Sequence, residues 1–360
     1  MYYHLLLTKR CNLNCIYCGG SEETYCDPEI QYTLEDLINF IKKDPEPVIA
    51  FYGGEPLLRI PLMERIMDRI PVRTFILQTN GCFLEKVHND YLKGFHTIVV
   101  SVDGREETTD FYRGKGTYAK VRNNVMNVRS RGYKGDLVAR MTISENSDVY
   151  EDVIHLLEMK NPAFDHVHWQ LDVIWSKDSE WRNFDGWINN SYNPGISKLV
   201  NHWYEEMQTN GRVQGIVPFI PVMRTLLTGE KSSLRCGSGL DFFAIHPSGK
   251  ITSCPISSDP AFVVGDIWNS HPLKLRNIMR VGSPCPECEV YWICGGRCLY
   301  ANMKKHWGEE GFRKVCGTVK HLIREMEGVK PQIVKLIKKE VLSLRDFYYP
   351  EINNCCEIIP

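Results

Sequence analysis

Six short runs of apolar and β-branched residues mark the first half of the chain, and amphipathic stretches separate them. The runs are HLLLT at 4–8, VIAFYGG at 48–54, TFILQTNG at 74–81, TIVVSVDG at 97–104, LVARMTI at 137–143 and HVHWQLDV at 166–173. Continuous apolar runs are typical of strands that are covered on both faces, as in parallel sheets. The pattern therefore predicts six parallel strands.

The segments between these runs predict crossover helices. Residues 118–132, for example, carry Val121, Val125 and Val128 at a spacing that puts all three on one helical face. Strands that alternate with helices indicate the α/β class, and six such units predict a partial (β/α)6 barrel of the TIM type. In such a sheet, the loops after the carboxyl ends of the strands build the active site.

Polar and glycine-rich loops follow each of the first four runs. They are the cysteine loop that begins at Cys11, Gly53-Gly54-Glu55-Pro56, Thr79-Asn80-Gly81 and Ser101-Val102-Asp103-Gly104. Turn formation explains any one of them. Four such loops in register indicate a shared site at one rim of the barrel.

The second half of the chain is less regular. Residues 161–235 are rich in tryptophan, are interrupted by Pro194, Gly195, Pro218 and Pro221, and contain one clear helical pattern at 196–211. After Cys236 the composition shifts to cysteine, glycine and proline, with a hairpin signal at 246–249, and a helical pattern returns at 315–345. We expect three parts, which are a barrel with a bridging segment (1–225), a cysteine-rich domain (226–320) and a C-terminal helix with a tail (321–360).

Composition limits the class of protein. The net charge is −1 with 24% charged residues, so no global basic field predicts a nucleic-acid or membrane partner. No apolar run approaches the roughly 20 residues of a membrane span, and the sequence predicts a cytoplasmic protein. Fourteen cysteines in a reducing compartment indicate metal ligation or redox chemistry instead of disulfides.

The first cysteine group is Cys11, Cys15 and Cys18, spaced C-x3-C-x2-C with Tyr17 before the last thiol. Structural zinc sites usually show paired C-x2-C knuckles, and closed cluster sites show four ligands. Three thiolates on a four-iron cluster leave one iron open, which is a feature of catalytic sites.

This spacing, together with the Gly-Gly-Glu-Pro loop one βα unit later, resembles the radical S-adenosylmethionine (SAM) superfamily. The resemblance implies a [4Fe–4S] cluster on Cys11, Cys15 and Cys18 whose open iron binds the amino and carboxylate groups of SAM. Reductive cleavage of SAM then gives methionine and a 5′-deoxyadenosyl radical that abstracts hydrogen from the substrate.

The resemblance also implies the SAM-binding residues. These are Tyr17 at the adenine, Gly53, Gly54, Glu55 and Pro56 at the amino group, Ser101 or Asp103 at the ribose, and Arg140 at the carboxylate. Ser101, Asp103 and Arg140 equally fit ordinary roles at strand ends or in ion pairs.

A second cysteine group follows the barrel, with a G-x4-C element at 249–254 and a C-x2-C-x5-C-x3-C element at 285–298. It resembles the SPASM extension of radical SAM enzymes; a zinc site is the alternative. The resemblance implies two auxiliary [4Fe–4S] clusters, and thus three in all. Their ligands would be Cys236, Cys254 and Cys298 for the first and Cys285, Cys288, Cys294 and Cys316 for the second.

The first auxiliary set lacks a fourth cysteine, because Phe242 stands where some relatives have one. Either an iron is open there, or Asp241, Cys355, Cys356 or solvent completes the site. Cys26 and Cys82 are interpreted as buried thiols that act as small apolar residues.

SPASM enzymes mostly modify ribosomally made peptides or proteins, by thioether or carbon–carbon links, epimerisation, or oxidation to formylglycine. The last class places an aspartate base directly after the cysteine of the G-x4-C element. Pro255 stands there, which disfavours sulfatase maturation, since proline removes no proton. The resemblance is greatest to peptide maturases of archaeal type, with a peptide or protein substrate and a ferredoxin- or flavodoxin-like electron donor.

Three alternatives stay open at this stage. They are a radical SAM dehydrogenase of a small molecule, an iron–sulfur electron-transfer protein, and a zinc-stabilised binding module. The tryptophans of the bridging segment either line a peptide groove or belong to the core; they are Trp169, Trp175, Trp181, Trp187 and Trp203.

Overall fold

The computed structural model describes residues 1–19, 29–162, 164–174, 181, 183–257, 259–353 and 359–360. The chain forms two compact units. Unit 1 comprises Met1–Val102, Thr109–Val138 and Cys236–Arg280, and unit 2 comprises Asp103–Thr108, Ala139–Arg235 and Val281–Pro360. The three-part division expected from composition stays a prediction.

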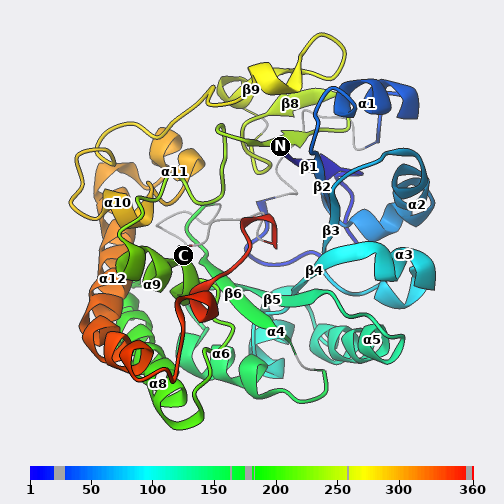
Figure 1. Ribbon diagram of the computed structural model, residues 1–360. Coiled ribbons are helices and arrows are strands. Elements are labelled where there is room, and N and C mark those ends of the chain that lie inside the picture. Colours follow the sequence, from blue (N-terminus) through cyan, green and yellow to red (C-terminus); the bar gives the residue numbers. More distant parts are fainter. Residues whose placement is uncertain (20–28, 163, 175–180, 182, 258, 354–358) are drawn as a thin grey trace. The chain divides into compact units, whose positions relative to one another are not determined.

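Unit 1 is built from βα repeats followed by a hairpin (Figure 1). Its elements are β1 (Tyr2–Leu6), α1 (Leu34–Ile41), β2 (Val48–Tyr52), η2 (Pro56–Arg59), α2 (Ile60–Arg69), β3 (Thr74–Thr79), η3 (Leu84–Lys86), α3 (Asn89–Gly94), β4 (Phe95–Ser101), α5 (Thr117–Ser130), β7 (Phe242–Ile245), β8 (Lys250–Thr252), η6 (Pro260–Phe262), β9 (Val263–Asp266) and η7 (Pro272–Lys274). Two elements, α4 (Glu106–Arg113) and β5 (Asp136–Ile143), continue from one unit into the other.

Unit 2 is mainly helical. Its elements are α6 (Val149–Glu158), β6 (His166–Leu171), α7 (Phe184–Trp187), the π-helical turn η5 (Ile188–Tyr192), α8 (Asn193–Asn210), α9 (Phe219–Thr228), α10 (Tyr291–Cys294), α11 (Leu299–Lys304), α12 (Gly308–Lys338), η8 (Leu344–Phe347) and η9 (Glu351–Asn353). Strands β5 and β6 are neighbours in the sheet.

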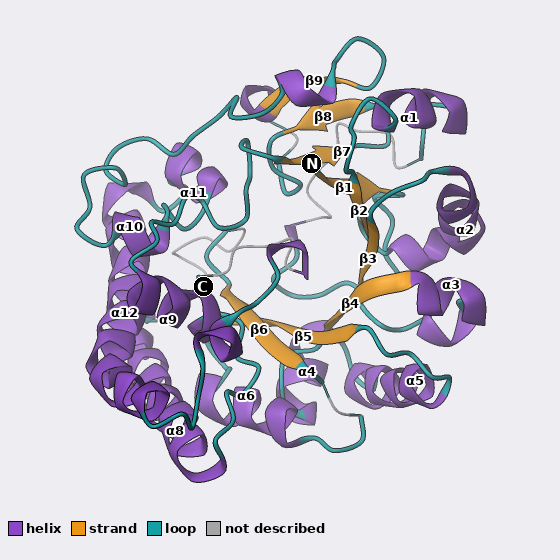
Figure 2. Cartoon of the chain, in the orientation of Figure 1, coloured by secondary structure: helices purple, strands orange, loops and turns teal. Residues whose placement is uncertain are grey.

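The strands of unit 1 lie in the order β4-β3-β2-β1-β7-β8-β9. Pairing is parallel from β4 to β7, with Leu5 opposite Phe51 and Tyr3 opposite Phe243, and it is antiparallel in the β7–β8–β9 hairpins. Helices α1, α2 and α3 lie along one side of β1–β4 (Figure 2). All six predicted strands and the hairpin at 246–249 are confirmed, as is the α/β class with a parallel sheet.

The predicted helix at 118–132 is α5, and Val121, Val125 and Val128 are buried. In the bridging segment the prediction was incomplete. Pro194 lies in the first turn of α8, and Pro218 and Pro221 begin α9, which was not expected. Proline is compatible with these positions because the first turn of a helix has no partner for its N–H groups.

The tryptophans of the bridging segment belong to the core. Trp169 and Trp203 are fully buried, and Trp181 and Trp187 nearly so, while Trp175 lies outside the described residues. They therefore support the packing of unit 2 and do not line an open groove. Among the described helices, none combines the length and the apolar character that crossing a bilayer requires.

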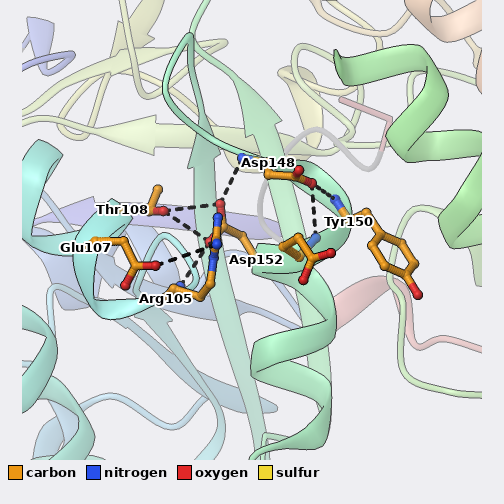
Figure 3. A network of polar contacts seen from close by, with 7 residues as sticks. Arg105, Glu107, Thr108, Asp148, Tyr150 and Asp152 are labelled. Atoms are coloured by element: carbon orange, nitrogen blue, oxygen red, sulfur yellow. Dashed lines mark hydrogen bonds and ion pairs between the residues drawn. The ribbon is translucent and has the colours of Figure 1, made fainter. Parts of the chain in front are cut away.

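A buried carboxylate holds the start of α4 to α6 in unit 2 (Figure 3). Asp152 accepts hydrogen bonds from the backbone N–H and Nε of Arg105, at 3.1 and 2.8 Å, and from Thr108 Oγ1 at 3.1 Å. The N–H of Asp148 donates to its second oxygen at 3.0 Å. The segment that follows β4 is thereby fixed by charge-assisted hydrogen bonds.

His4 of β1 is a buried ring, and neither of its nitrogens has a hydrogen-bond partner in the described part of the chain. The ring stacks on Tyr52 with centroids 4.6 Å apart and meets the edge of Phe242 at 4.7 Å. Burial disfavours the charged ring and lowers the pKa of His4 from 6.5 to about 3.

His4 should make the protein less stable in mild acid. The unfolded chain takes up a proton below about pH 6.5 that the folded His4 does not, so stability is present above that pH and is lost as the pH falls towards 3. Between pH 8 and 5.5 this should lower the free energy of unfolding by about 1.4 kcal/mol. Urea unfolding at both pH values should show this loss in the wild type and not in H4F; equal losses would contradict the assignment.

Candidate active site

The first cysteine group lies in the loop directly after β1. Cys11 and Cys18 are exposed and Cys15 is partly exposed. The sulfur of Cys11 accepts the N–H of Leu13 at 3.4 Å, and the N–H of Cys18 donates to the carbonyl of Cys15 at 3.0 Å. Cys18 lies within electrostatic range of Cys11, so the loop brings these two thiols together.

Glu55 connects this loop with two neighbouring ones. Its carboxylate is fully buried and accepts hydrogen bonds from Leu57 N–H at 2.9 Å, Thr79 Oγ1 at 2.7 Å and Asn80 N–H at 2.8 Å. Burial raises the pKa of Glu55 to about 7, although the three donors act in the opposite direction. The side chain therefore fixes the position of Asn80 relative to the second loop.

Asn80 carries this connection to the cysteine loop. Its Nδ2 lies 2.9 Å from Asn12 Oδ1 and 3.7 Å from the sulfur of Cys11, and its Oδ1 accepts the N–H of Cys82 at 3.0 Å. An amide that donates to a cysteine sulfur stabilises the thiolate form that binds iron. Asn80 was not predicted as a site residue, although its loop was identified from the sequence.

Gly53 and Gly54 allow the second loop to lie directly against the chain that leads into Cys11. The N–H of Gly54 donates to Thr8 O at 2.9 Å, and that of Glu55 to Arg10 O at 2.8 Å. A Cβ on Gly53 would lie 2.2 Å from Thr8 O, and one on Gly54 would lie 2.2 Å from Arg10 O. The φ of +134° at Gly53 also favours glycine.

Tyr17 packs against the end of α4. Its ring centroid lies 5.4 Å from that of Tyr112, and the guanidinium carbon of Arg113 lies 5.5 Å from the Tyr17 ring centroid. The N–H of Ile16 donates to the carbonyl of Tyr112 at 2.9 Å. The cysteine loop is thus held on this side by both backbone and aromatic contacts.

The residues expected at the SAM ribose and carboxylate have neighbours of their own. Asp103 is fully buried, and its Oδ1 accepts the N–H of Thr142 at 2.9 Å. Arg140 is buried, with Nη1 3.4 Å from Nδ1 of His168. Ser101 is partly exposed at the end of β4. Their roles towards SAM stay predictions.

Four cysteines of the second group come together in unit 2. The pKa of Cys285 is raised to about 12, mainly by burial and then by the neighbouring thiols of Cys316, Cys294 and Cys288. The pKa of Cys316 rises to about 11 for the same reasons, against the influence of Arg297. These are the four residues that the sequence predicts as one ligand set.

The four thiols line a cavity of about 490 Å³ in unit 2, which Cys298 also lines. Arg297 is buried in its wall, and its positive charge favours the thiolate forms of Cys294 and Cys316. Arg297 adopts a left-handed backbone conformation with φ of 47°. This residue was not predicted as a site residue, although it stands between Cys294 and Cys298, two predicted ligands.

The other predicted set, Cys236, Cys254 and Cys298, is divided between the units, with the first two residues in unit 1. Phe242 is buried in β7, where its ring contacts His4 and Tyr2. Cys82 is buried, as expected. Cys26, Cys355 and Cys356 lie outside the described residues.

None of the cysteines among the described residues forms a disulfide. Within that same part of the chain, no three His, Cys, Asp or Glu side chains are positioned to hold a single metal ion. The four thiols that line the cavity of unit 2 are a donor set of the kind that a four-iron cluster binds, with one cysteine to each iron.

Comparison with known proteins identifies the first part of the chain. Residues 5–158 match the model of the radical SAM superfamily. This range of residues contains the cysteine loop, Glu55 and Asn80. These residues form a radical SAM domain. Such a domain implies one [4Fe–4S] cluster and SAM, and the protein is a radical SAM enzyme.

Relatives extend over most of this radical SAM enzyme. An AdoMet-dependent heme synthase of Methanosarcina barkeri is 24% identical over 81% of this chain and 88% of its own length. The structure of anSMEcpe with bound AdoMet matches with a TM-score of 0.73 at 19% identity, covering 94% of this chain and 100% of that one. Streptococcus suis SuiB, bound to its precursor peptide SuiA, matches with a TM-score of 0.55 at 16% identity over 84% and 72%. At these identities the two structures show the fold alone.

Replacing Gly54 with alanine should destabilise the radical SAM domain, because the new Cβ would meet the backbone of Arg10. We expect the free energy of unfolding to fall by about 1–3 kcal/mol, or more if the backbone is displaced. The matched control is Gly328→Ala in α12, where a new Cβ would have no atom within 4 Å. The higher helix propensity of alanine should raise the free energy of unfolding there by about 0.5–1 kcal/mol. Denaturant unfolding measures the free energy of unfolding of both variants. An unchanged value for G54A would contradict the close approach of Gly54 to the backbone of Arg10.

Proposed function

We propose that this radical SAM enzyme carries three [4Fe–4S] clusters and abstracts hydrogen from a residue of a ribosomally made peptide or protein. The observation that carries the proposal is the cysteine-lined cavity of unit 2. A radical SAM domain requires only its first three cysteines, so a second set of gathered thiols supports a further cluster. It supports the SPASM assignment made from the spacing.

The neighbouring structures support a peptide substrate. The structure of anSMEcpe is described with bound AdoMet and Cp18Cys peptide, and that of SuiB with precursor peptide SuiA. Both matches extend beyond the radical SAM domain, over 94% and 84% of this chain. The proposed modification is a thioether or other cross-link, an epimerisation or an oxidation.

In this proposal, Cys11, Cys15 and Cys18 hold the first cluster and SAM occupies its open iron. When bound, the cluster supplies the electron that cleaves SAM to methionine and a 5′-deoxyadenosyl radical. Asn80 orients Cys11 and stabilises its thiolate, and Glu55 fixes Asn80. Gly53 and Gly54 hold the second loop directly against the backbone of residues 8–10, which would place it beside the first cluster and SAM.

The remaining SAM contacts are proposed from the family pattern. Tyr17 would lie at the adenine, Ser101 or Asp103 at the ribose, Arg140 at the carboxylate, and Pro56 beside Glu55 at the amino group. The carboxylate of Asp103 accepts the N–H of Thr142, which holds the end of the loop after β4 to β5.

For the auxiliary clusters, we assign Cys285, Cys288, Cys294 and Cys316 to one, and Cys236, Cys254 and Cys298 to the other. The electrostatic coupling among the four thiols supports the first assignment. The second rests on the spacing of the residues in the sequence.

A small-molecule substrate is the second candidate. The heme synthase of Methanosarcina barkeri matches over a larger share of its own length, 88%, than SuiB does. In this alternative the same radical chemistry would act on a compact substrate such as a tetrapyrrole side chain.

Iron content tests the cluster assignment. After anaerobic reconstitution, the wild type should bind about twelve irons, and C285A/C288A/C316A about four fewer. C11A/C15A/C18A should also lose about four irons, and with them all formation of 5′-deoxyadenosine from SAM. C82A is the control and should keep both. Unchanged iron in the unit 2 variant would refute the auxiliary site, and unchanged SAM cleavage in the loop variant would refute the active site.

Deuterium transfer tests the substrate class. Extracts of the source cells grown in deuterated medium are separated into a tryptic peptide fraction and a small-molecule fraction. Each is incubated with the enzyme, SAM and dithionite, and 5′-deoxyadenosine is analysed by mass spectrometry. The proposal expects deuterium from the peptide fraction. Deuterium only from the small-molecule fraction would establish the second candidate in its place.

A further inference from the structure

A basic segment borders the cysteine loop. The 25 residues from Phe111 to Gly135 include seven Lys or Arg and no Asp or Glu, in a chain whose net charge is −1. The seven are Arg113, Lys115, Lys120, Arg122, Arg129, Arg131 and Lys134. Most of this segment is α5, which lies with α3 on the outer side of β4 (Figure 2).

Four exposed cations lie on the first two turns of α5 and on the segments beside them, and we call this region the basic face: Lys86, Lys115, Lys120 and Arg122. Lys86 and Lys120 lie over the ring of Phe83, with Nζ 4.5 and 5.1 Å from its centroid. In the described part of the chain, none of the four has an ion-pair partner.

The acidic residue directly before this segment binds the N-terminal end of α5. Asp110 accepts the N–H groups of Gly116 at 2.6 Å and Tyr118 at 2.8 Å. Its charge therefore lies at the N-terminus of α5, where the helix dipole favours a negative group. Glu85, next to Lys86, is an exposed acidic residue beside the face. Its single negative charge does not balance the four positive charges, so the face has a net positive charge.

The segment that carries most of the basic face also contacts the loop that holds the first three cysteines. Tyr112 and Arg113 contact Ile16 and Tyr17 through the hydrogen bond and ring contacts described above. Lys120 lies within electrostatic range of Cys82, which in turn lies within range of Cys11. Lys120 is therefore linked electrostatically, through Cys82, to the cysteine loop.

Two exposed apolar side chains lie at this border. Ile16, between Cys15 and Cys18, is 67% exposed, and Phe111, at the end of α4, is 55% exposed. Apolar residues flanked by one sign of charge are typical of protein docking sites, where the charges steer the encounter and the apolar residues form the contact.

We propose that the basic face, with Ile16 and Phe111, docks an acidic one-electron carrier protein that reduces the cluster of the cysteine loop. The inference rests on the proposed function, because it supplies the electron which that function requires. One electron leaves the carrier for each SAM whose carbon–sulfur bond is broken. The reduced carrier, of the low-potential ferredoxin or flavodoxin class, is the only reductant needed.

Charge reversal separates docking from chemistry, because dithionite reduces the protein without a docking surface. The test variant is K115E/K120E/R122E in the reconstituted full-length enzyme. Formation of 5′-deoxyadenosine is measured with dithionite and with reduced flavodoxin as the probe carrier. The variant should raise the KM for flavodoxin about tenfold or more and lose the salt dependence of the rate, while its dithionite rate stays unchanged.

The matched control is K335E/K338E/K339E, which makes the same change of charge at exposed positions of the end of α12 in unit 2. It should behave as the wild type with both reductants. Iron content verifies that both variants are loaded.

Three outcomes would overturn the proposal. An unchanged KM for flavodoxin would show that the face does not dock the carrier. An equal loss of 5′-deoxyadenosine formation with both reductants would show that these residues support the SAM site. Unchanged SAM cleavage with both reductants, but loss of deuterium transfer from the peptide fraction, would assign the face to the substrate. Failure of the wild type to cleave SAM with dithionite would instead refute the proposed function itself.

Discussion

The buried carboxylate of Glu55 is the interaction on which the arrangement of the radical SAM site depends. It accepts donors from its own loop and from the loop after β3, and Asn80 extends this network to the sulfur of Cys11. Three segments far apart in the sequence are thereby held around one thiol. A charge that is taken out of water must be compensated by several donors, and here those donors belong to the loops that the site requires.

The strands and most helices follow from local patterns. A run such as VIAFY is apolar at every position because both faces of β2 are covered, and no tertiary information is needed to recognise it. The helix α9 was missed because Pro218 and Pro221 were interpreted as breaks. Whether a proline ends or begins a helix depends on the residues after it, and α9 continues only over residues 222–228 after its second proline.

The site was predictable to the extent that its residues are close together in the sequence. Cys11, Cys15 and Cys18 share one loop, and their spacing, together with the Gly-Gly-Glu-Pro loop, predicts a cluster. Asn80 is 69 residues from Cys11, and their contact arises only when β1 and β3 take their places in the sheet. Likewise, Arg297 is recognisable beside Cys294 and Cys316 only once α12 brings Cys316 to the same cavity.

The two glycines before Glu55 impose an asymmetric constraint on how this sequence can diverge. The atoms that exclude a Cβ there belong to the main chain of Thr8, Lys9 and Arg10, whose own side chains play no part in the contact. No substitution at those three positions makes room, since every residue has the same backbone. Gly53 and Gly54 should therefore be fixed without a covarying partner, because this contact places no demand on the side chains of the residues they touch.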